Sequence, residues 1–220
     1  MMESINRIIT WLPQLINGAK MTIIITILSV AIGLVLSLFL ALGKMSKNPI
    51  LNKPCSAYIF FFRGTPLLMQ IYFIYFGLPQ FNPALTIRSA FVAAMIAYTL
   101  NTAAYLAENI RAGLESIDKG QHEAAKALGM TYGQTMRLVI IPQTVRRLIP
   151  PVGNEFIMVL KDVSLVAIIG LSDLTKVTRA ISSSTASALV YIPAMIIYLI
   201  ITAFFTFFFN RLEKKYSVYE

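Results

Sequence analysis

The sequence predicts an all-α integral membrane protein with about five transmembrane helices, its N-terminus outside and its C-terminus inside. Of the 220 residues, 57% are hydrophobic and only 13% are charged, and the mean hydropathy of +0.70 exceeds that of soluble domains. Several apolar runs reach the roughly 20 residues that a helix needs to cross the hydrocarbon core. The formal net charge is +9, but the basic residues are dispersed beside the apolar runs. This pattern favours a membrane protein and argues against nucleic-acid binding.

Five apolar segments account for the predicted spans, within a single transmembrane domain covering residues 1–220. The expected spans are residues 21–43, 57–78, 89–107, 148–171 and 189–210. The first and the fifth contain no charged residue, and the second is interrupted by Arg63 and a Gly-Thr-Pro triplet. The fourth is the least apolar, because it contains Asn154, Glu155, Lys161 and Asp162.

Residues 1–19 precede the first span and carry apolar side chains at helical spacing, with Trp11 beside them and Pro13 interrupting them. This pattern predicts an amphipathic helix in the outer membrane interface, anchored by the tryptophan. No small-residue cleavage site follows the first long apolar run, so we expect this span to remain in the mature protein.

The basic residues that flank the spans predict the orientation. They concentrate between spans one and two, between spans three and four, and after span five: Lys44, Lys47, Lys53, Arg111, Lys119, Lys126, Arg137, Arg146, Arg147, Arg211, Lys214 and Lys215. Because cytoplasmic loops carry an excess of Lys and Arg, these three segments are expected to be cytoplasmic.

The longest of these segments, residues 112–147, is too polar to span the membrane. Residues 121–129 are rich in Ala, Glu, Lys and Leu, which favours a short helix, and Gly129 suits its C-terminal end. Small Ala124 and Ala125 would allow a partner to approach closely, and Glu123 offers it a charge. From spacing alone, a solvated helical loop with no partner remains an equal alternative.

Residues 120–143, GQHEAAKALGMTYGQTMRLVIIPQ, resemble the EAA loop of bacterial ABC-importer permeases, in particular the polar amino-acid uptake family. Residues 63–70, 101–111 and 151–165 resemble other runs of that family. The resemblance implies a MetI-like type I importer fold in the bacterial inner membrane. It also implies a coupling helix that docks in a groove of a separate ATPase, with Gly120, Glu123, Ala124, Ala125, Leu128 and Gly129 as the coupling residues.

The same resemblance implies the partners. These are an ABC ATPase, a second permease subunit in a homodimer or heterodimer, an extracytoplasmic amino-acid-binding protein, the amino-acid substrate and membrane lipid. The chain contains no G-x-x-x-x-G-K-[ST] loop. We therefore expect no cofactor in this chain, with ATP and magnesium on the partner ATPase.

No catalytic or metal motif is complete. Residues 122–126, HEAAK, resemble H-E-x-x-H, but Lys126 replaces the second histidine and His122 is the only histidine present. Cys55 is the only cysteine, which rules out an intrachain disulfide. The sequence therefore predicts neither an enzyme nor a metal site.

Polar residues within the spans are the candidates for substrate binding, because ionisable groups in a membrane usually face a partner or a water-filled cavity. Glu155 and Asp162 are seven residues apart and share a helix face. Lys161 either lines the same path or pairs with a carboxylate as structural support. On the third span, Asn101 could line the path, and Glu108 is expected to pair with Arg111 or to act as a gate.

The second span offers a further set of candidates, Gly64, Thr65, Pro66 and Leu67. Pro66 frees a backbone carbonyl, so exposed backbone groups at this irregularity could receive the amino and carboxylate groups of a substrate. Arg63 is interpreted as a residue whose side chain reaches back to the membrane interface.

Glutamine-type members of the resembling family tend to have Gln where this chain has Glu155. A carboxylate there would complement a guanidinium or ammonium group, which predicts import of arginine, lysine or histidine. A glutamine, glutamate or broad polar specificity is the alternative. Two other classes remain: an ion-coupled secondary transporter that uses Glu155, Lys161 and Asp162 as a relay, and a membrane sensor or scaffold that transports nothing.

Overall fold

The computed structural model describes the backbone of residues 2–216 and the side chains of residues 7–216. The described chain forms ten α-helices: α1 (Met2–Met45), α2 (Pro49–Gly64), α3 (Leu67–Tyr72), α4 (Leu78–Phe81), α5 (Ala90–Glu115), α6 (Lys119–Ala127), α7 (Tyr132–Thr135), α8 (Ile141–Asp162), α9 (Leu174–Thr185) and α10 (Tyr191–Tyr216). Two π-helical turns (Phe73–Gly77 and Met136–Ile140) and three 3₁₀ segments (Pro83–Leu85, Val163–Ile169 and Ala188–Val190) connect them.

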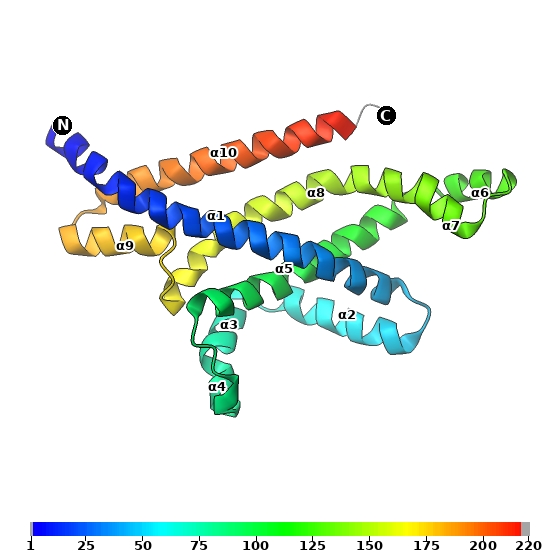
Figure 1. Ribbon diagram of the computed structural model, residues 1–220, viewed down its shortest axis with the longest axis horizontal. Helices are drawn as coiled ribbons and strands as arrows, with labels where there is room; N and C mark the ends of the chain where they lie inside the picture. The colour runs from blue at the N-terminus through cyan, green and yellow to red at the C-terminus, as the bar shows by residue number, and fades with distance from the viewer. Residues whose placement is uncertain (1, 217–220) are drawn as a thin grey trace.

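The long helices α1, α8 and α10 run along the longest axis of the molecule (Figure 1). The N-terminal part of α1 and α9 lie at one end of this axis, and α6 with α7 projects from the other. The turn between α1 and α2 and the end of α10 lie toward the α6 end. The three segments that the charge pattern assigns to the cytoplasm thus lie toward one end of the molecule.

Small residues allow α1 and α5 to pack closely. The side of α1 that faces α5 carries buried Thr26, Ser29 and Ser37 with Gly33 among them, and α5 presents buried alanines. A Cβ at Gly33 would lie 3.2 Å from the methyl group of Thr102. The hydroxyls of Thr26 and Ser37 donate to helix carbonyls one turn back, so they are satisfied inside this interface. Close approach through small residues is how helices associate in a membrane.

Three helices are long and apolar enough to cross a membrane, at Arg7–Met45, Ala90–Glu115 and Ala188–Tyr216, and a bent pair, Pro49–Gly64 with Leu67–Phe81, makes a possible fourth. The predicted count was about five. The expected fourth span, 148–171, falls on the end of α8 and the following 3₁₀ segment, and it lies outside this set. Its four polar or charged residues, Asn154, Glu155, Lys161 and Asp162, make it less apolar than the other spans.

The expected second span, 57–78, is a broken element. The helix pair bends by 105° at the break, so that α3 and α4 form an arm that projects from the body of the molecule (Figure 1). Pro66 stands at the break with an extended backbone, ψ 132°. Since proline has no N–H to donate, α2 cannot continue through it.

The interfacial segment expected at 1–19 is not a separate element, because α1 continues without interruption past Lys20. Trp11, Leu15 and Ala19 are buried against α9 and α10. A Cβ at Gly18 would lie 2.9 Å from the Asp173 carbonyl oxygen. The tryptophan is therefore a packing residue in this chain, where the sequence pattern predicted a membrane anchor.

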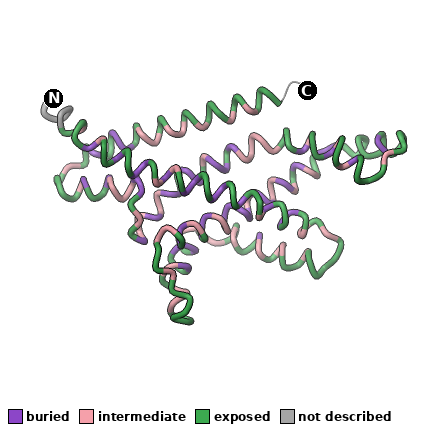
Figure 2. The backbone as a smooth tube through the Cα atoms, viewed as in Figure 1, coloured by how far each residue is buried: buried purple, intermediate pink, exposed green. Residues whose placement is uncertain are grey.

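Burial follows the same arrangement. The buried positions lie mainly along α1, α5 and α8, whereas α10 and the α3–α4 arm are mostly exposed or intermediate (Figure 2). The largest buried cluster joins Ile25, Ile71, Tyr98, Phe156 and Val166 across five elements. This cluster holds the three helix faces that surround the cavity described next.

Candidate functional site

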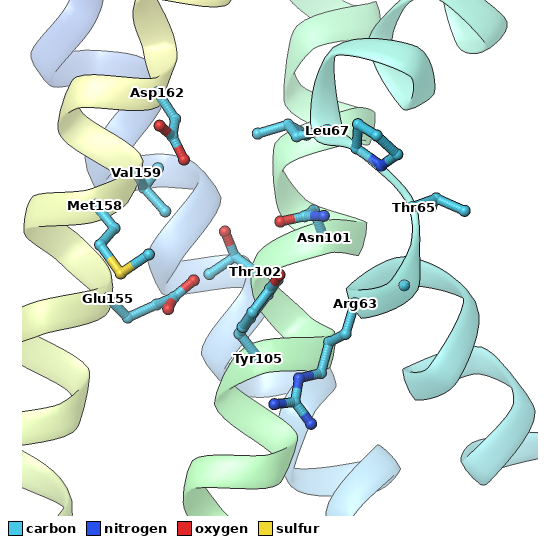
Figure 3. A pocket seen from close by; sticks show the side chains of 12 residues that line it. Arg63, Thr65, Leu67, Asn101, Thr102, Tyr105, Glu155, Met158, Val159 and Asp162 are labelled. Atoms are coloured by element: carbon cyan, nitrogen blue, oxygen red, sulfur yellow. The ribbon is translucent and has the colours of Figure 1, made fainter.

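A cavity of about 350 Å³ lies between the α2–α3 break, α5 and α8. Its lining consists of Arg63, Gly64, Thr65, Pro66, Leu67, Asn101, Thr102, Tyr105, Glu155, Met158, Val159 and Asp162. Figure 3 shows the carboxylates of α8 on one side and the break on the other, with α5 between them. Seven of the eight predicted substrate residues thus surround one space, although they come from three separate parts of the sequence.

The broken helix is braced from within the protein. The Phe62 carbonyl would normally accept a hydrogen bond from residue 66, but Pro66 has no N–H. Instead, Gln70 Nε2 and Asn101 Nδ2 each donate to the Phe62 oxygen at 3.0 Å. Asn101 Nδ2 also donates to Gln70 Oε1 at 3.0 Å. The Phe62 carbonyl, which we expected to be free for a substrate, therefore already accepts hydrogen bonds from Gln70 and Asn101.

These hydrogen bonds fix the orientation of Asn101. Because its amide nitrogen faces the break, its side-chain oxygen points into the cavity toward α8 (Figure 3). Asn101 thus presents an acceptor to the cavity and a donor to the break. A single amide braces the helix and adds to the polar lining.

Two carboxylates dominate the opposite wall. Glu155 and Asp162 both point into the cavity (Figure 3), as their seven-residue spacing predicted. Glu155 is 8% exposed, and neither carboxylate takes part in an ion pair with a described residue. Tyr98, fully buried on α5, donates to the Asp162 backbone oxygen at 2.5 Å and holds this end of α8 in place.

Lys161 does not join them. It is exposed and lies outside the cavity lining. Adjacent residues on an α-helix point about 100° apart, so a helix that turns Asp162 inward turns Lys161 away. The structure therefore does not bring Lys161 together with the other predicted substrate residues.

The sequence interpretation missed five lining residues: Arg63, Thr102, Tyr105, Met158 and Val159. Met158 and Val159 follow Glu155 by three and four residues, and Tyr105 follows Asn101 by four, so helical spacing contains a signal for them. Arg63 was interpreted as an interface residue. Instead its guanidinium lies over the Tyr105 ring, 5.3 Å from the ring centre.

A cluster of charges lies beside the cavity and joins α1, α2 and α5. Glu108 pairs with Lys44 from α1, and its Oε2 lies 2.9 Å from Arg111 Nη2 and 3.7 Å from Arg63 Nη1. The predicted pairing of Glu108 with Arg111 is confirmed. A second hollow, lined by Lys44, Ser56, Ile59, Phe60, Arg63, Gly64 and Tyr105, shares three residues with the cavity. Arg63 and Tyr105 are the two large side chains that separate the hollows.

The predicted coupling residues lie on or directly after α6, at the projecting end of the molecule (Figure 1). Gly120, Glu123, Ala124, Leu128 and Gly129 are exposed. Ala125 is 3% exposed, so its side chain packs against this chain. One face of a short amphipathic helix must pack against its own protein, and Ala125 lies on that face of α6.

Gly129 ends α6, as the sequence predicted. Its φ is +75°, in the left-handed region that glycine adopts without strain. The Met130 N–H donates to the Ala125 oxygen at 3.1 Å, which is the hydrogen bond expected beyond a glycine-terminated helix. Thr131 and Gln134 then form a reciprocal cap at the start of α7. The coupling segment is thus a locally encoded helix and turn.

Comparison with known proteins places the chain in a family. Residues 33–218 match the family described as "Binding-protein-dependent transport system inner membrane component". The chain is 39% identical over 208 residues to the glutamine transport system permease protein GlnP of Escherichia coli strain K12, with 94% of each chain covered. It is 38% identical over 205 residues to the arginine transport system permease protein ArtQ of Bacillus subtilis strain 168, with 93% of each covered.

Solved structures agree with this placement. The fold is similar to a chain of an amino acid ABC transporter crystallised with histidines, with a TM-score of 0.88, 42% identity, and coverage of 94% of this chain and 96% of that one. An inward-facing structure of the MetNI methionine ABC transporter gives a TM-score of 0.77 at 20% identity, covering 92% of this chain and 96% of that one. This last similarity concerns the fold alone and confirms the predicted MetI-like architecture.

The family excludes the two other classes that the sequence left open, the ion-coupled secondary transporter and the sensor. It also implies a binding protein and an ATPase as partners, with this chain as the component that is not itself catalytic. The chain belongs to the binding-protein-dependent transport family of inner-membrane components and is the multi-pass permease subunit of an amino-acid ABC importer.

Proposed function

We propose that this permease carries cationic amino acids, arginine, lysine or histidine, and that Glu155 and Asp162 bind the cationic side chain. The observation that carries the proposal is the charge of the cavity. Its lining contains two carboxylates and one cation, Arg63, which leaves one net negative charge when all three groups are ionised. A cationic amino acid would balance that charge.

Other amino acids fit this lining less well. Glutamine carries no net charge and would leave a carboxylate without a partner in a partly buried site, which is unfavourable. Glutamate would add a third carboxylate. Overall identity does not discriminate between these substrates, because relatives at 39% and 38% identity are named for glutamine and for arginine. The argument for a cation therefore rests on the lining alone.

We expect two permeases to pair and an extracytoplasmic binding protein to deliver the amino acid. The exposed coupling residues Gly120, Glu123, Ala124, Leu128 and Gly129 would dock on the ATPase, which holds ATP and magnesium. Closure of the ATPases would then move α6 and alternate the access to the cavity.

The test is direct binding to the permease–ATPase complex in detergent, without the binding protein, which could impose its own selectivity. Labelled arginine, lysine, histidine and glutamine are compared in wild type, Glu155→Gln and Asp162→Asn. Loss of a hydrogen bond to a charged group corresponds to about a 10- to 100-fold change in affinity. We expect losses of that size for arginine in both variants and less than about 3-fold for glutamine.

Glu213→Gln is the matched control, because Glu213 is an exposed carboxylate on α10 outside the cavity. It should leave arginine binding unchanged. ATP-dependent uptake in proteoliposomes, with binding protein added, then checks that the bound amino acid is the one transported. Preferential binding of glutamine that is indifferent to both substitutions would rule out the cationic specificity.

A further inference from the structure

Arg63 is the single cation among the twelve residues that line the cavity, all of them described. Every α-amino acid carries one carboxylate, and the carboxylates of the lining cannot bind it. The Phe62 carbonyl is occupied by Gln70 and Asn101 and is an acceptor in any case. Among the lining residues, Arg63 alone can oppose the negative charge of this carboxylate with a positive one.

Glu108 interacts less closely with Arg63 than with Lys44 and Arg111. Glu108 pairs closely with Lys44, and Arg111 donates to Glu108 Oε2 from both Nε at 3.1 Å and Nη2 at 2.9 Å. Arg63 Nη1 lies 3.7 Å from that oxygen, beyond hydrogen-bonding distance. If Arg63 moved away, Glu108 would keep two cationic partners, so the movement leaves no carboxylate unpaired.

The surroundings of Arg63 also allow the movement. Its side chain is 44% exposed, and its guanidinium lies over the Tyr105 ring at the partition between the two hollows. A rotation about the long side chain could carry the guanidinium from the Glu108 side to the cavity side. The planar fork of an arginine matches a carboxylate in a two-bond geometry.

We propose that Arg63 binds the α-carboxylate of the amino acid, and that its guanidinium moves away from Glu108 when it does. Arg63 then binds the carboxylate that all amino acids share, while Glu155 and Asp162 bind the side chain. The inference rests on the proposed use of this cavity as the substrate site. It does not depend on the cationic specificity, because the carboxylate is common to every candidate substrate.

The experiment measures how strongly the complex prefers arginine to agmatine, which is arginine without its carboxylate. Binding is measured on the permease–ATPase complex in detergent, with no binding protein present. Wild type should prefer arginine by about 10- to 100-fold, the range for a charge-assisted contact. Arg63→Gln should reduce the preference to within about 3-fold, mainly by weakening arginine binding, and Arg63→Lys should retain part of it.

Lys44→Gln is the matched control. Lys44 shares Glu108 with Arg63 but is absent from the cavity lining, so its loss disturbs the charge cluster without touching the site. It should leave the preference for arginine unchanged. An equal loss in Lys44→Gln and Arg63→Gln would overturn the inference, because Arg63 would then act only through the cluster.

Other outcomes separate this inference from the proposed specificity. If Arg63→Gln keeps the wild-type ratio of arginine affinity to agmatine affinity, no contact between Arg63 and the carboxylate exists and the inference fails. If the complex prefers glutamine, the same comparison is made with glutamine and 4-aminobutanamide, its decarboxylated form. Arg63 can then be supported although the cationic specificity has failed. If Arg63→Gln does not assemble, Arg63→Ala takes its place. Loss of the preference for arginine in Arg63→Ala would support the inference, and full retention would contradict it.

Discussion

The cavity and the coupling segment are built in opposite ways. The cavity collects residues from α2, α5 and α8, which are distant in the sequence, and its shape depends on contacts such as Asn101 to Phe62. The coupling segment is one contiguous helix and turn, with its predicted residues exposed except for Ala125. A substitution in the cavity should therefore disturb the geometry of the binding site. A substitution in the coupling segment should weaken coupling to the ATPase and leave the binding site intact.

The largest expected effect is on the brace of the broken helix. Asn101→Leu removes two hydrogen bonds, to the Phe62 carbonyl and to Gln70 Oε1, and leaves buried polar atoms with fewer partners. We expect the free energy of unfolding to fall by about 2–4 kcal/mol. Thermal unfolding of the purified complex would measure the loss.

Asn154→Leu is the comparison for that variant, because it makes the same substitution at an exposed asparagine. It should change the free energy of unfolding by less than about 0.5 kcal/mol. Equal effects of the two substitutions would mean that the brace contributes nothing specific to stability.

A smaller effect is expected at the proposed docking surface for the ATPase. Leu128 is 81% exposed, and an exposed leucine on a docking helix is expected to become buried by the partner. Leu128→Ala should weaken binding of the ATPase by about 1–2 kcal/mol, measured by titrating ATPase onto the permease. Arginine binding to the permease should not change, and a parallel loss there would contradict the separation of the two regions.

The smallest expected effect concerns the turn after α6. Gly129→Ala places a Cβ at φ +75°, although no atom lies within 4 Å of it. The strain of a left-handed alanine should cost about 1 kcal/mol of local stability. Hydrogen exchange of the α6 amides would report it as faster exchange.

Gly133→Ala supplies the control, because Gly133 is within α7 and an added Cβ would likewise meet no neighbouring side chain within 4 Å. Its φ is not positive. Alanine favours a helix over glycine, so the substitution should leave exchange unchanged or slow it. Faster exchange in both variants would show that the backbone angle of Gly129 is not the cause.

The structure of the coupling segment could be predicted from the sequence more fully than that of the cavity, for a physical reason. Local signals, such as helix formers before a glycine, gave the position and the end of α6. Helical spacing also brought Glu155 and Asp162 to one face. The side on which a helix packs is a tertiary property, however, so the inward turn of Ala125 and the outward turn of Lys161 could not be deduced from composition.

Arg63 illustrates the same limit. An arginine near the end of an apolar run usually extends toward the membrane interface. The ring of Tyr105 and the charge of Glu108, which lie on another helix, draw it toward the interior. The break at Pro66 was visible in the sequence, but the partner that satisfies the freed carbonyl, Asn101, lies 39 residues away.

The internal brace of the α2–α3 break has a consequence for turnover. Because the side-chain amides of Gln70 and Asn101 satisfy the Phe62 carbonyl, this oxygen does not need a hydrogen bond from the substrate. Release into the cell therefore does not have to break a bond on which the shape of the binding site depends. Such a transporter can release its substrate and keep the hydrogen bonds that shape the helix break at its binding site.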